Sequence, residues 1–271
     1  MIVDTRPSWW SRQGVWWLVV VLFVGAWAVS LRDWRNGERG GTAAADPQPA
    51  PVPQDPGPPI RRTGFESLFQ PGAPVRVEGD PAVLAVREVG TLDLPSGRLI
   101  ACDPFVLADF PDTEQPFQVA VPPGRYPVSI SLTQPAGDTP LRLGTRVVAA
   151  RLTIRPEPVT RWDLALRPGD DPTTLQPNEF FGFGVDTGTA AFLDAASIPA
   201  LQRIGGPEGQ LSEQMDDTGL EPGGWDVPDP VSGHNVIAFN SGLGDGAYPT
   251  WIGWTATNQP AVFVTDFLVV D

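Results

Sequence analysis

Residues 146–154 read RVVAARLTI, and after a turn-like RPEP at 155–158 the chain continues with VTRWDLAL at 159–166. Runs of β-branched or alternating apolar residues bounded by Pro, Gly and Asp are typical of strands, so these two runs predict consecutive strands. Segments with the same pattern lie on both sides and predict a β-rich domain over residues 65–271. These segments are residues 83–88, 97–100, 117–121, 126–133, 181–185, 235–240, 248–256 and 261–269.

Short turn sequences connect two pairs of these predicted strands. Pro122-Pro123-Gly124 lies between residues 117–121 and 126–133 and predicts a hairpin. Asn258-Gln259-Pro260 predicts a closing hairpin of the last two strands. Such short connections favour antiparallel neighbours.

Helical periodicity is persuasive at one place only. Residues 190–204 carry apolar side chains at about a 3.6-residue period, with Pro199 expected either to break the helix or to begin a new first turn. Residues 205–234 are rich in Gly, Pro and Asp and predict a long loop around Trp225. The expected fold class is therefore α+β and mostly β, a mainly antiparallel sheet with one or two helices, and the sequence leaves the strand order open.

The N-terminal part of the chain has a different composition. Residues 15–31 read VWWLVVVLFVGAWAVSL, an uncharged run with tryptophans near both ends. A helix over residues 14–31 is about 27 Å long, close to the hydrocarbon thickness of a bilayer, and indole rings favour the headgroup boundary. We expect, in chain order, a tail over 1–13, a transmembrane anchor over 14–34, a proline-rich disordered stalk over 35–64 and the globular domain over 65–271.

This N-terminal segment leaves two alternatives open. Arg6, Arg12 and the small-x-small site Ala26-Trp27-Ala28 also fit a cleaved signal peptide. The arginines around the span slightly favour a cytoplasmic domain, whereas the seven prolines of residues 43–59 make an extended spacer that favours display on the outer face. We expect an uncleaved, single-pass anchor with an extracytoplasmic domain.

The charge of the chain is unevenly distributed. Residues 65–271 contain 11 arginines and 27 acidic residues, a net charge of −16, within a total of −14. Such a domain repels phosphates, so nucleic acid is excluded as a partner, and a basic protein or peptide is the better candidate. The alternative is that the charge only keeps the domain soluble.

Residue types on which many enzymes depend are scarce. Cys102 is the only cysteine and His234 the only histidine, which excludes an intrachain disulfide and a thiolate metal cluster. The sequence has no G-x-S-x-G elbow, Walker A loop, H-E-x-x-H motif or G-x-G-x-x-G after a strand. These absences favour a non-catalytic domain.

Several short motifs occur in a fixed order along the domain. They are PPGRYPV at 122–128, FGVDTGT at 183–189, FLD at 192–194, GDGAYP at 244–249 and VTDF at 264–267. In this series the chain resembles the bacterial family called domain of unknown function 4241, over about residues 85–270. The resemblance implies a bacterial protein and a shared domain, but no activity and no localisation. We expect the anchor to lie in the bacterial cytoplasmic membrane because of its own apolar run.

Three of these motifs centre on an aspartate. Asp186, Asp194 and Asp245 could converge across loops, and clustered carboxylates suit a hard cation such as Ca²⁺ or Mg²⁺. Apart from this ion, the sequence points to no cofactor. The alternative is structural: Asp-Gly pairs are typical of tight turns, and Asp194 fits the first turn of a helix.

Aromatic residues near the C-terminus provide a second candidate site. Trp251 and Trp254 are three positions apart, which puts them on opposite faces of a regular strand, so that one of them, with Tyr248, could contact a ligand or partner. Core packing of both tryptophans, helped by a bulge at Gly253, is the alternative. We expect a membrane-anchored, non-catalytic binding or interaction module; the alternative is a divalent-cation-dependent hydrolase that uses the three aspartates.

Overall fold

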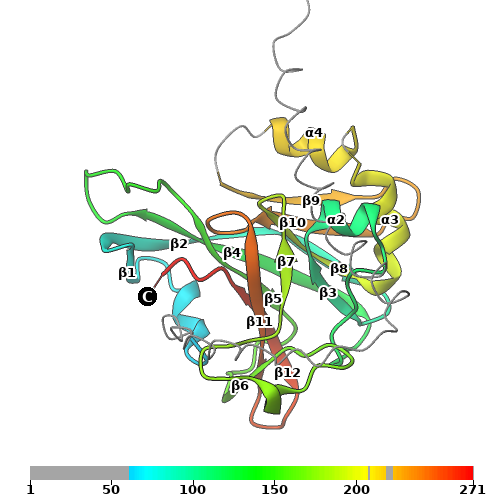
Figure 1. Cartoon of the computed structure of the whole chain (residues 1–271), viewed down its shortest axis with the longest axis horizontal. Helices are drawn as coiled ribbons and strands as arrows, with labels where there is room; N and C mark the ends of the chain where they lie inside the picture. The colour runs from blue at the N-terminus through cyan, green and yellow to red at the C-terminus, as the bar shows by residue number, and fades with distance from the viewer. Residues whose placement is uncertain (1–60, 207, 218–221, 271) are drawn as a thin grey trace, which may run out of the picture. The chain divides into compact units, whose positions relative to one another are not determined.

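Two antiparallel sheets form the framework of the protein in the computed structural model, which describes residues 61–206, 208–217 and 222–270 (Figure 1). The predicted tail and anchor, and most of the predicted stalk, lie outside these residues. Within the part that is described, no helix has the length and apolar character needed to cross a membrane. The described residues belong to one compact unit of the chain, Asp55–Asp271.

The larger sheet has eight strands, in the order β1-β2-β4-β5-β12-β11-β6, with β7 also paired to β11. All of these neighbours are antiparallel. The strands are β1 (Pro74–Val77), β2 (Asp80–Leu94), β4 (Gly124–Pro135), β5 (Val147–Thr153), β6 (Arg161–Leu164), β7 (Gly182–Val185), β11 (Gly246–Trp254) and β12 (Pro260–Asp266).

The smaller sheet has four antiparallel strands in the order β3-β8-β10-β9. They are β3 (Leu99–Cys102), β8 (Thr189–Asp194), β9 (Gly224–Pro228) and β10 (Asn235–Asn240). Three short helices lie beside it: α2 (Pro104–Asp109), α3 (Ile198–Ile204) and α4 (Gln210–Asp217). Short 3-10 turns complete the fold at η3 (Phe65–Phe69), η4 (Pro172–Thr174) and η5 (Ala195–Ser197).

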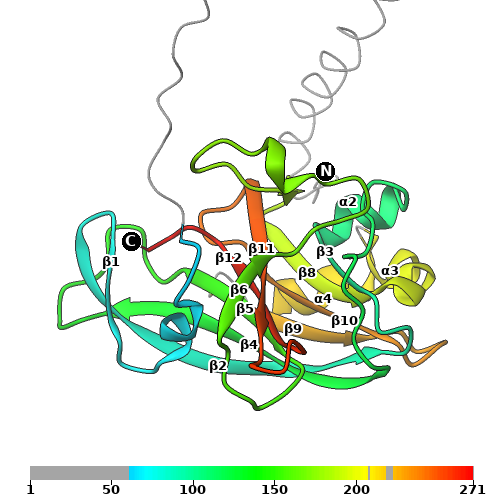
Figure 2. The same ribbon diagram turned by 90° about the horizontal axis from the view of Figure 1, so that it is seen from below.

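The core consists of two layers. The main apolar cluster lies between the sheets and combines strands of the larger sheet with Phe192 and Phe239 of the smaller one, whose rings are 5.0 Å apart. The second cluster lies on the other face of the smaller sheet, where Leu193 and Val236 pack with Leu201 and Leu211 of the helices. Figure 2 shows α3 and α4 beside the strands of this sheet. The smaller sheet is therefore covered on both faces.

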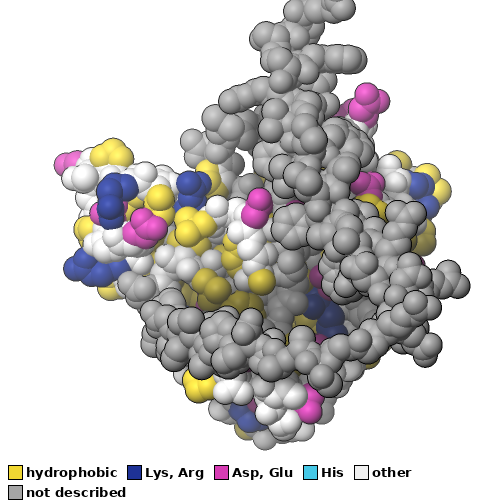
Figure 3. Space-filling view, in the orientation of Figure 1, with side chains coloured by type: hydrophobic (Ala, Val, Ile, Leu, Met, Phe, Trp, Pro, Cys, Tyr) yellow, Lys and Arg dark blue, Asp and Glu magenta, His cyan; other side chains and the backbone are white. Residues whose placement is uncertain are grey.

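Surface charge at the outer end of the larger sheet is interleaved. Figure 3 shows basic and acidic side chains side by side at the left of this face. An ion pair joins the β1–β2 turn to a distant loop: Arg142 Nε lies 3.0 Å from Asp80 Oδ2, and Arg142 Nη2 donates to the carbonyl of Glu78 at 2.6 Å. The acidic excess is therefore partly balanced here by local pairing.

The predicted fold class is confirmed in its coarse form, mostly antiparallel β with few helices. The closing hairpin is also confirmed, because β11 and β12 are joined through residues 255–259. The hairpin at Pro122-Pro123-Gly124 is wrong. Residues 117–121 lie beside β3 instead, with Phe117 N donating to Leu99 O at 2.9 Å, and β4 pairs with β2 and β5.

The predicted helix over 190–204 is wrong in its first third. Residues 189–194 form β8, and the helix begins only at Ile198, with Pro199 in its first turn. Because β8 is buried on both faces, its four central residues, Ala190–Leu193, are continuously apolar and lack the alternation that identifies a strand. Within the predicted loop over 205–234 the chain forms α4 and β9, and Trp225 belongs to β9.

Candidate functional site

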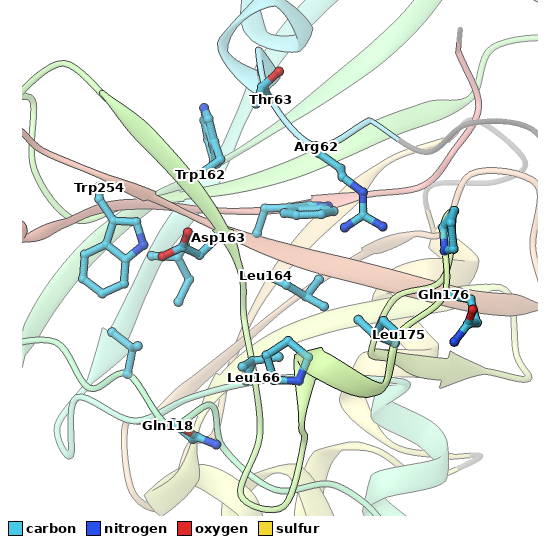
Figure 4. A pocket seen from close by; sticks show the side chains of 15 residues that line it. Arg62, Thr63, Gln118, Trp162, Asp163, Leu164, Leu166, Leu175, Gln176 and Trp254 are labelled. Carbon is cyan, nitrogen blue, oxygen red and sulfur yellow. The ribbon is translucent and has the colours of Figure 1, made fainter.

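A cavity of about 870 Å³ lies at the end of the larger sheet where β6 pairs with β11 (Figure 4). We call it the tryptophan groove. Its walls come from five segments that are far apart in the sequence. They are residues 62–63, 118–119, the β6 region with Trp162, Asp163, Leu164 and Leu166, the loop with Pro172, Leu175, Gln176 and Pro177, and Trp251, Ile252 and Trp254 of β11.

Trp251 and Trp254 line the cavity from opposite faces of β11. The register between β11 and β12 shifts between Gly253 and Trp254, and the extra residue is Ala261 of β12. Because β11 pairs with β6 without a shift from Trp251 to Trp254, the two tryptophans keep the opposite orientations that the alternation of a strand gives them. The cavity therefore extends around the edge strand β6, and both tryptophans contribute to its walls.

The position of Gly253 has no room for a side chain. A Cβ atom at this position would lie 2.7 Å from a methyl carbon of Val159 and 2.8 Å from one of Val262, closer than real contacts allow. On β6 the residue opposite Gly253 is Trp162. The glycine therefore lets the two strands and the neighbouring valines pack closely beneath the groove.

The aromatic wall is braced from η3. The Phe65 ring is stacked on Trp251 with centroids 5.2 Å apart and meets Trp162 edge-on at 4.8 Å. Trp251 is only 3% exposed, whereas Trp162 and Trp254 are half-buried. Trp162 and Trp254 thus offer apolar surface to a ligand, and Trp251 supports the wall behind them.

Two arginines and one carboxylate set the charge of the groove. The Arg62 guanidinium lies 5.9 Å from the Trp251 ring centroid, and that of Arg161 lies 5.0 Å from the Trp254 ring centroid. Arg161 also forms an ion pair with Asp163. The carboxylate in the groove is therefore neutralised locally, while each arginine makes a cation–π contact with the aromatic wall.

Two indole donors of the groove have no acceptor. The Nε1 atoms of Trp251 and Trp254 are buried, and neither has a hydrogen-bond partner among the described residues. Figure 4 shows the Trp254 nitrogen on the side of its ring that faces Asp163. A buried donor without a partner costs about 1–3 kcal/mol, so these two indoles lower the stability of the aromatic wall.

Arg167 fixes the loop that forms the far wall. Its side chain donates to the carbonyls of Gln115, Gly182 and Ala101 at 2.9–3.1 Å and lies 2.8 Å from Glu114 Oε2. Burial raises the pKa of Glu114 to about 7, although the positive charge of Arg167 opposes this shift. The loop is therefore held in place by a largely buried arginine.

Tyr248, which the sequence analysis placed with the two tryptophans, lies away from the groove. It is 5% exposed, and its hydroxyl donates to the carbonyls of Ser241 and Gly244 at 3.1 and 2.8 Å. Burial and the charge of Asp245 raise its pKa. Tyr248 therefore closes the turn before β11.

Asp194 has the capping role given above as an alternative to metal binding. Its Oδ1 accepts hydrogen bonds from Ala196 N and Ser96 Oγ, both at 2.7 Å, and its Oδ2 accepts one from Ser96 N at 3.0 Å. The residue is fully buried and is the N-cap of η5. Both carboxylate oxygens are thus occupied by protein donors.

Asp186 and Asp245 lie at the same end of the paired strands β7 and β11, whereas Asp194 lies far from both. The β7–β11 register pairs Val185 with Gly246, so the two aspartates adjoin the same end of these strands, and both are exposed. Asp194 ends β8 at the opposite end, about 17 Å along a strand that rises roughly 3.3 Å per residue. Only two of the three predicted ligands are therefore neighbours.

Asp103, which the sequence analysis did not select, organises this turn. Its Oδ2 accepts hydrogen bonds from the N–H groups of Asp186 and Thr187 and from Thr187 Oγ1, at 2.9–3.0 Å. Its Oδ1 caps α2 through Phe105 N and Val106 N. The available signal was the Asp-Pro pair at the start of α2, which is typical of a helix N-terminus.

Two further arrangements bear on catalysis. Across residues 61–206, 208–217 and 222–270, no group of three or more His, Cys, Asp and Glu side chains could hold a metal ion. Ser197 Oγ lies 3.4 Å from His234 Nδ1, yet Ser197 has no exposed surface. A substrate carbonyl therefore has no access to this hydroxyl.

The sequence analysis selected Trp251 and Trp254 but missed the other half of the groove. Trp162 lies in a predicted strand. The sequence feature that could have pointed to it is an aromatic residue between two oppositely charged residues, Arg161 and Asp163. Arg62 and Gln176 carried no signal, because their place in the groove depends on contacts between distant segments.

The comparisons with known proteins agree with the ordered motifs. A model of the family described as "Protein of unknown function (DUF4241)" matches residues 92–265, more than half of the chain. The searches of curated proteins and of solved structures give no match. The matched segment includes most of both sheets, the first four motifs and the first two residues of the fifth, VTDF at 264–267. The chain therefore belongs to the DUF4241 family.

Proposed function

We propose that the domain is a non-catalytic binding module whose tryptophan groove holds an extended segment of a protein partner. The observation that carries the proposal is that Trp162, Trp251 and Trp254 line one cavity of about 870 Å³. Ligand sites typically have volumes of about 300–1,000 Å³ and combine apolar walls with a few polar groups. Arg62, Asp163 and Gln176 are those polar groups here.

A polypeptide segment suits this groove for two reasons. Tryptophan and arginine are the residue types that most often dominate binding energy at protein interfaces. The groove also follows β6, which is the last strand in the order of its sheet, and extended peptides commonly lie along such edges.

The charge of the domain supports a basic partner. The net charge of −16 over residues 65–271 attracts basic segments over long distances and speeds their encounter. We further propose that the predicted anchor over residues 14–34 displays the module at the bacterial cytoplasmic membrane, where its partner would be met.

The test is a selection of peptides from a random library by the full chain in detergent micelles. We expect the selected peptides to bind the wild-type protein and to lose at least tenfold in affinity with Trp254→Ala, measured by fluorescence anisotropy. Phe110→Ala is the matched control, because Phe110 is also an aromatic residue, is 63% exposed and lies at the end of α2.

The control must retain the wild-type affinity. Equal binding by wild type and Trp254→Ala, with both proteins folded by circular dichroism, would show that the peptides use another surface. That result, or the absence of any selected peptide, would refute the proposed function.

A further inference from the structure

The outer edge of β6 carries backbone groups that no other strand uses. Ala165 N donates to Thr250 O at 2.8 Å, so in the β6–β11 register the odd-numbered residues of β6 direct their N–H and C=O groups to β11. Those of Trp162 and Leu164 point to the opposite side of the strand, because backbone groups alternate between the two sides of an antiparallel strand. Within the described part of the chain, these four groups make no hydrogen bond.

The chain itself fills one end of this edge. Gln118 N donates to Leu166 O at 2.8 Å, and residues 117–121 then continue along β3. The cavity lies beside this contact, since Gln118 lines it together with Trp162 and Leu164. Extended peptides commonly bind by adding a strand to an open sheet edge, and the space along β6 has the position of such a strand.

The two faces of β6 differ in their chemistry. Trp162 and Leu164 lie on one face, where the Phe65 ring packs against Trp162. Arg161 and Asp163 lie on the other face and form an ion pair whose side chains are 48% and 45% exposed. The cavity extends around both faces, so an added strand would place alternate side chains on the apolar and on the charged face.

The charges of β6 set the order of charges in a complementary strand. All strand pairs of the larger sheet are antiparallel, so we expect the same direction for an added strand. The residue opposite Asp163 then precedes the residue opposite Arg161 by two positions. Opposite charges directly across two strands stabilise the pair, and like charges destabilise it. The complementary segment therefore has a basic, an apolar and an acidic residue, in that order.

We propose that the occupant of the tryptophan groove is a partner segment that extends the larger sheet as an antiparallel strand along β6. This inference rests on the proposed function, in which the groove holds an extended segment. The segment exchanges backbone hydrogen bonds with Trp162 and Leu164 and places its apolar side chains on their face. It has a basic residue opposite Asp163 and an acidic residue opposite Arg161.

The first experiment measures the fluorescence anisotropy of labelled peptides on the full chain in detergent micelles. The probe is Thr-Val-Arg-Val-Glu-Val-Thr, and the matched control Thr-Val-Glu-Val-Arg-Val-Thr exchanges its two charges. We expect the control to bind wild type about tenfold more weakly, because it places like charges opposite Arg161 and Asp163. The double variant Arg161→Asp/Asp163→Arg reverses the exposed ion pair and should prefer the control peptide by a similar factor.

The second experiment tests the backbone pairing with N-methylated probes. In the proposed register the valine between the two charged residues pairs with Trp162, and its N–H points to β6. A methyl group on this nitrogen removes the donor, so we expect a loss of about tenfold in affinity. A methyl group on the arginine nitrogen faces away from β6 and is the matched control, with an expected loss below about twofold. Both probes are measured on wild type, so this experiment does not depend on the folding of a variant.

Three outcomes would overturn the inference. Equal binding of the probe and the charge-exchanged peptide to wild type would show that Arg161 and Asp163 do not select the segment. Equal affinities of the two methylated probes would show that the segment does not pair with the backbone of β6. No binding of either peptide would refute the added strand as well. In each case the proposed function still stands if peptides from the random library bind wild type and lose affinity with Trp254→Ala.

Discussion

Three buried aspartates hold loops of this protein in place through hydrogen bonds to their carboxylates. Asp103, Asp194 and Asp229 are at most 2% exposed, and each accepts hydrogen bonds from several donors. Asp103 joins α2 to the turn before β8, and Asp194 joins η5 to the loop at Ser96. Two of the motifs that mark the family therefore contain or contact a carboxylate with a structural role.

This role predicts a large stability loss for Asp194→Ala. The change removes a helix cap and leaves Ser96 N, Ser96 Oγ and Ala196 N without their acceptor, so we expect the free energy of unfolding to fall by about 2–4 kcal/mol. Urea denaturation measures the change. The exposed Asp245→Ala is the matched control, with an expected effect within about 0.5 kcal/mol. A stable Asp194→Ala protein whose melting temperature no longer rises with Ca²⁺ would instead support the metal site.

At the scale of single elements, Gly253 of β11 links stability to the groove. A Cβ at Gly253 would meet methyl carbons of Val159 and Val262 at 2.7–2.8 Å. We expect Gly253→Ala to cost about 1–3 kcal/mol and to alter the near-ultraviolet circular dichroism of the tryptophans, because the valines must shift beside Trp162, the residue opposite Gly253 on β6. Gly184→Ala in β7 is the matched control, since a Cβ there meets nothing within 4 Å. Equal spectra and stabilities for the two variants would mean that β11 tolerates a side chain at position 253.

A strand could be predicted from the sequence where its pattern of apolar residues has a single structural explanation. β10 and the β11–β12 hairpin agree with the predicted ranges within about two residues at most ends, because their apolar runs are bounded by clear turn signals. β8 was mistaken for a helix, since a strand buried on both faces has no polar side to reveal its period. β9 was missed because Gly, Pro and Asp surround its five residues.

At the scale of the whole molecule, the groove could be predicted only in part. Trp251 and Trp254 belong to one strand, so the sequence alone could predict that they lie near each other. The remaining walls come from segments about 75 to 190 residues away in the chain, and their meeting depends on strand order, which patterns of residues do not encode locally. The motifs suggested that Asp186, Asp194 and Asp245 could converge. Asp194 lies apart from the other two for the same reason, because the distance between motifs in space depends on strand order.

The pH dependence of folding is also a property of the whole domain. Burial raises the pKa of Asp266, at the end of β12, to about 6 from an ordinary value of 3.8, while the hydrogen bond from Leu268 N opposes this shift. The folded state therefore favours the neutral side chain. This contribution to stability is fully present below pH 3.8 and is lost as the pH rises through 6. The raised pKa of Glu114 acts in the same direction.

Asp266→Asn tests this expectation. At pH 8 ionisation of the buried wild-type carboxyl costs about 3 kcal/mol, from 1.36 kcal/mol for each pH unit between 3.8 and 6. At pH 4 the unfolded carboxyl is already more than half ionised, so about 0.6 kcal/mol of this cost is present there. The amide carries no charge, so between pH 4 and pH 8 the variant should gain about 2.4 kcal/mol in unfolding free energy relative to wild type, measured with urea at both pH values. The comparison at pH 4 is the internal control, because the folded wild-type side chain is then neutral too. A constant difference between the two proteins across this range would mean that folding does not raise the pKa of Asp266 and that the domain compensates its charge.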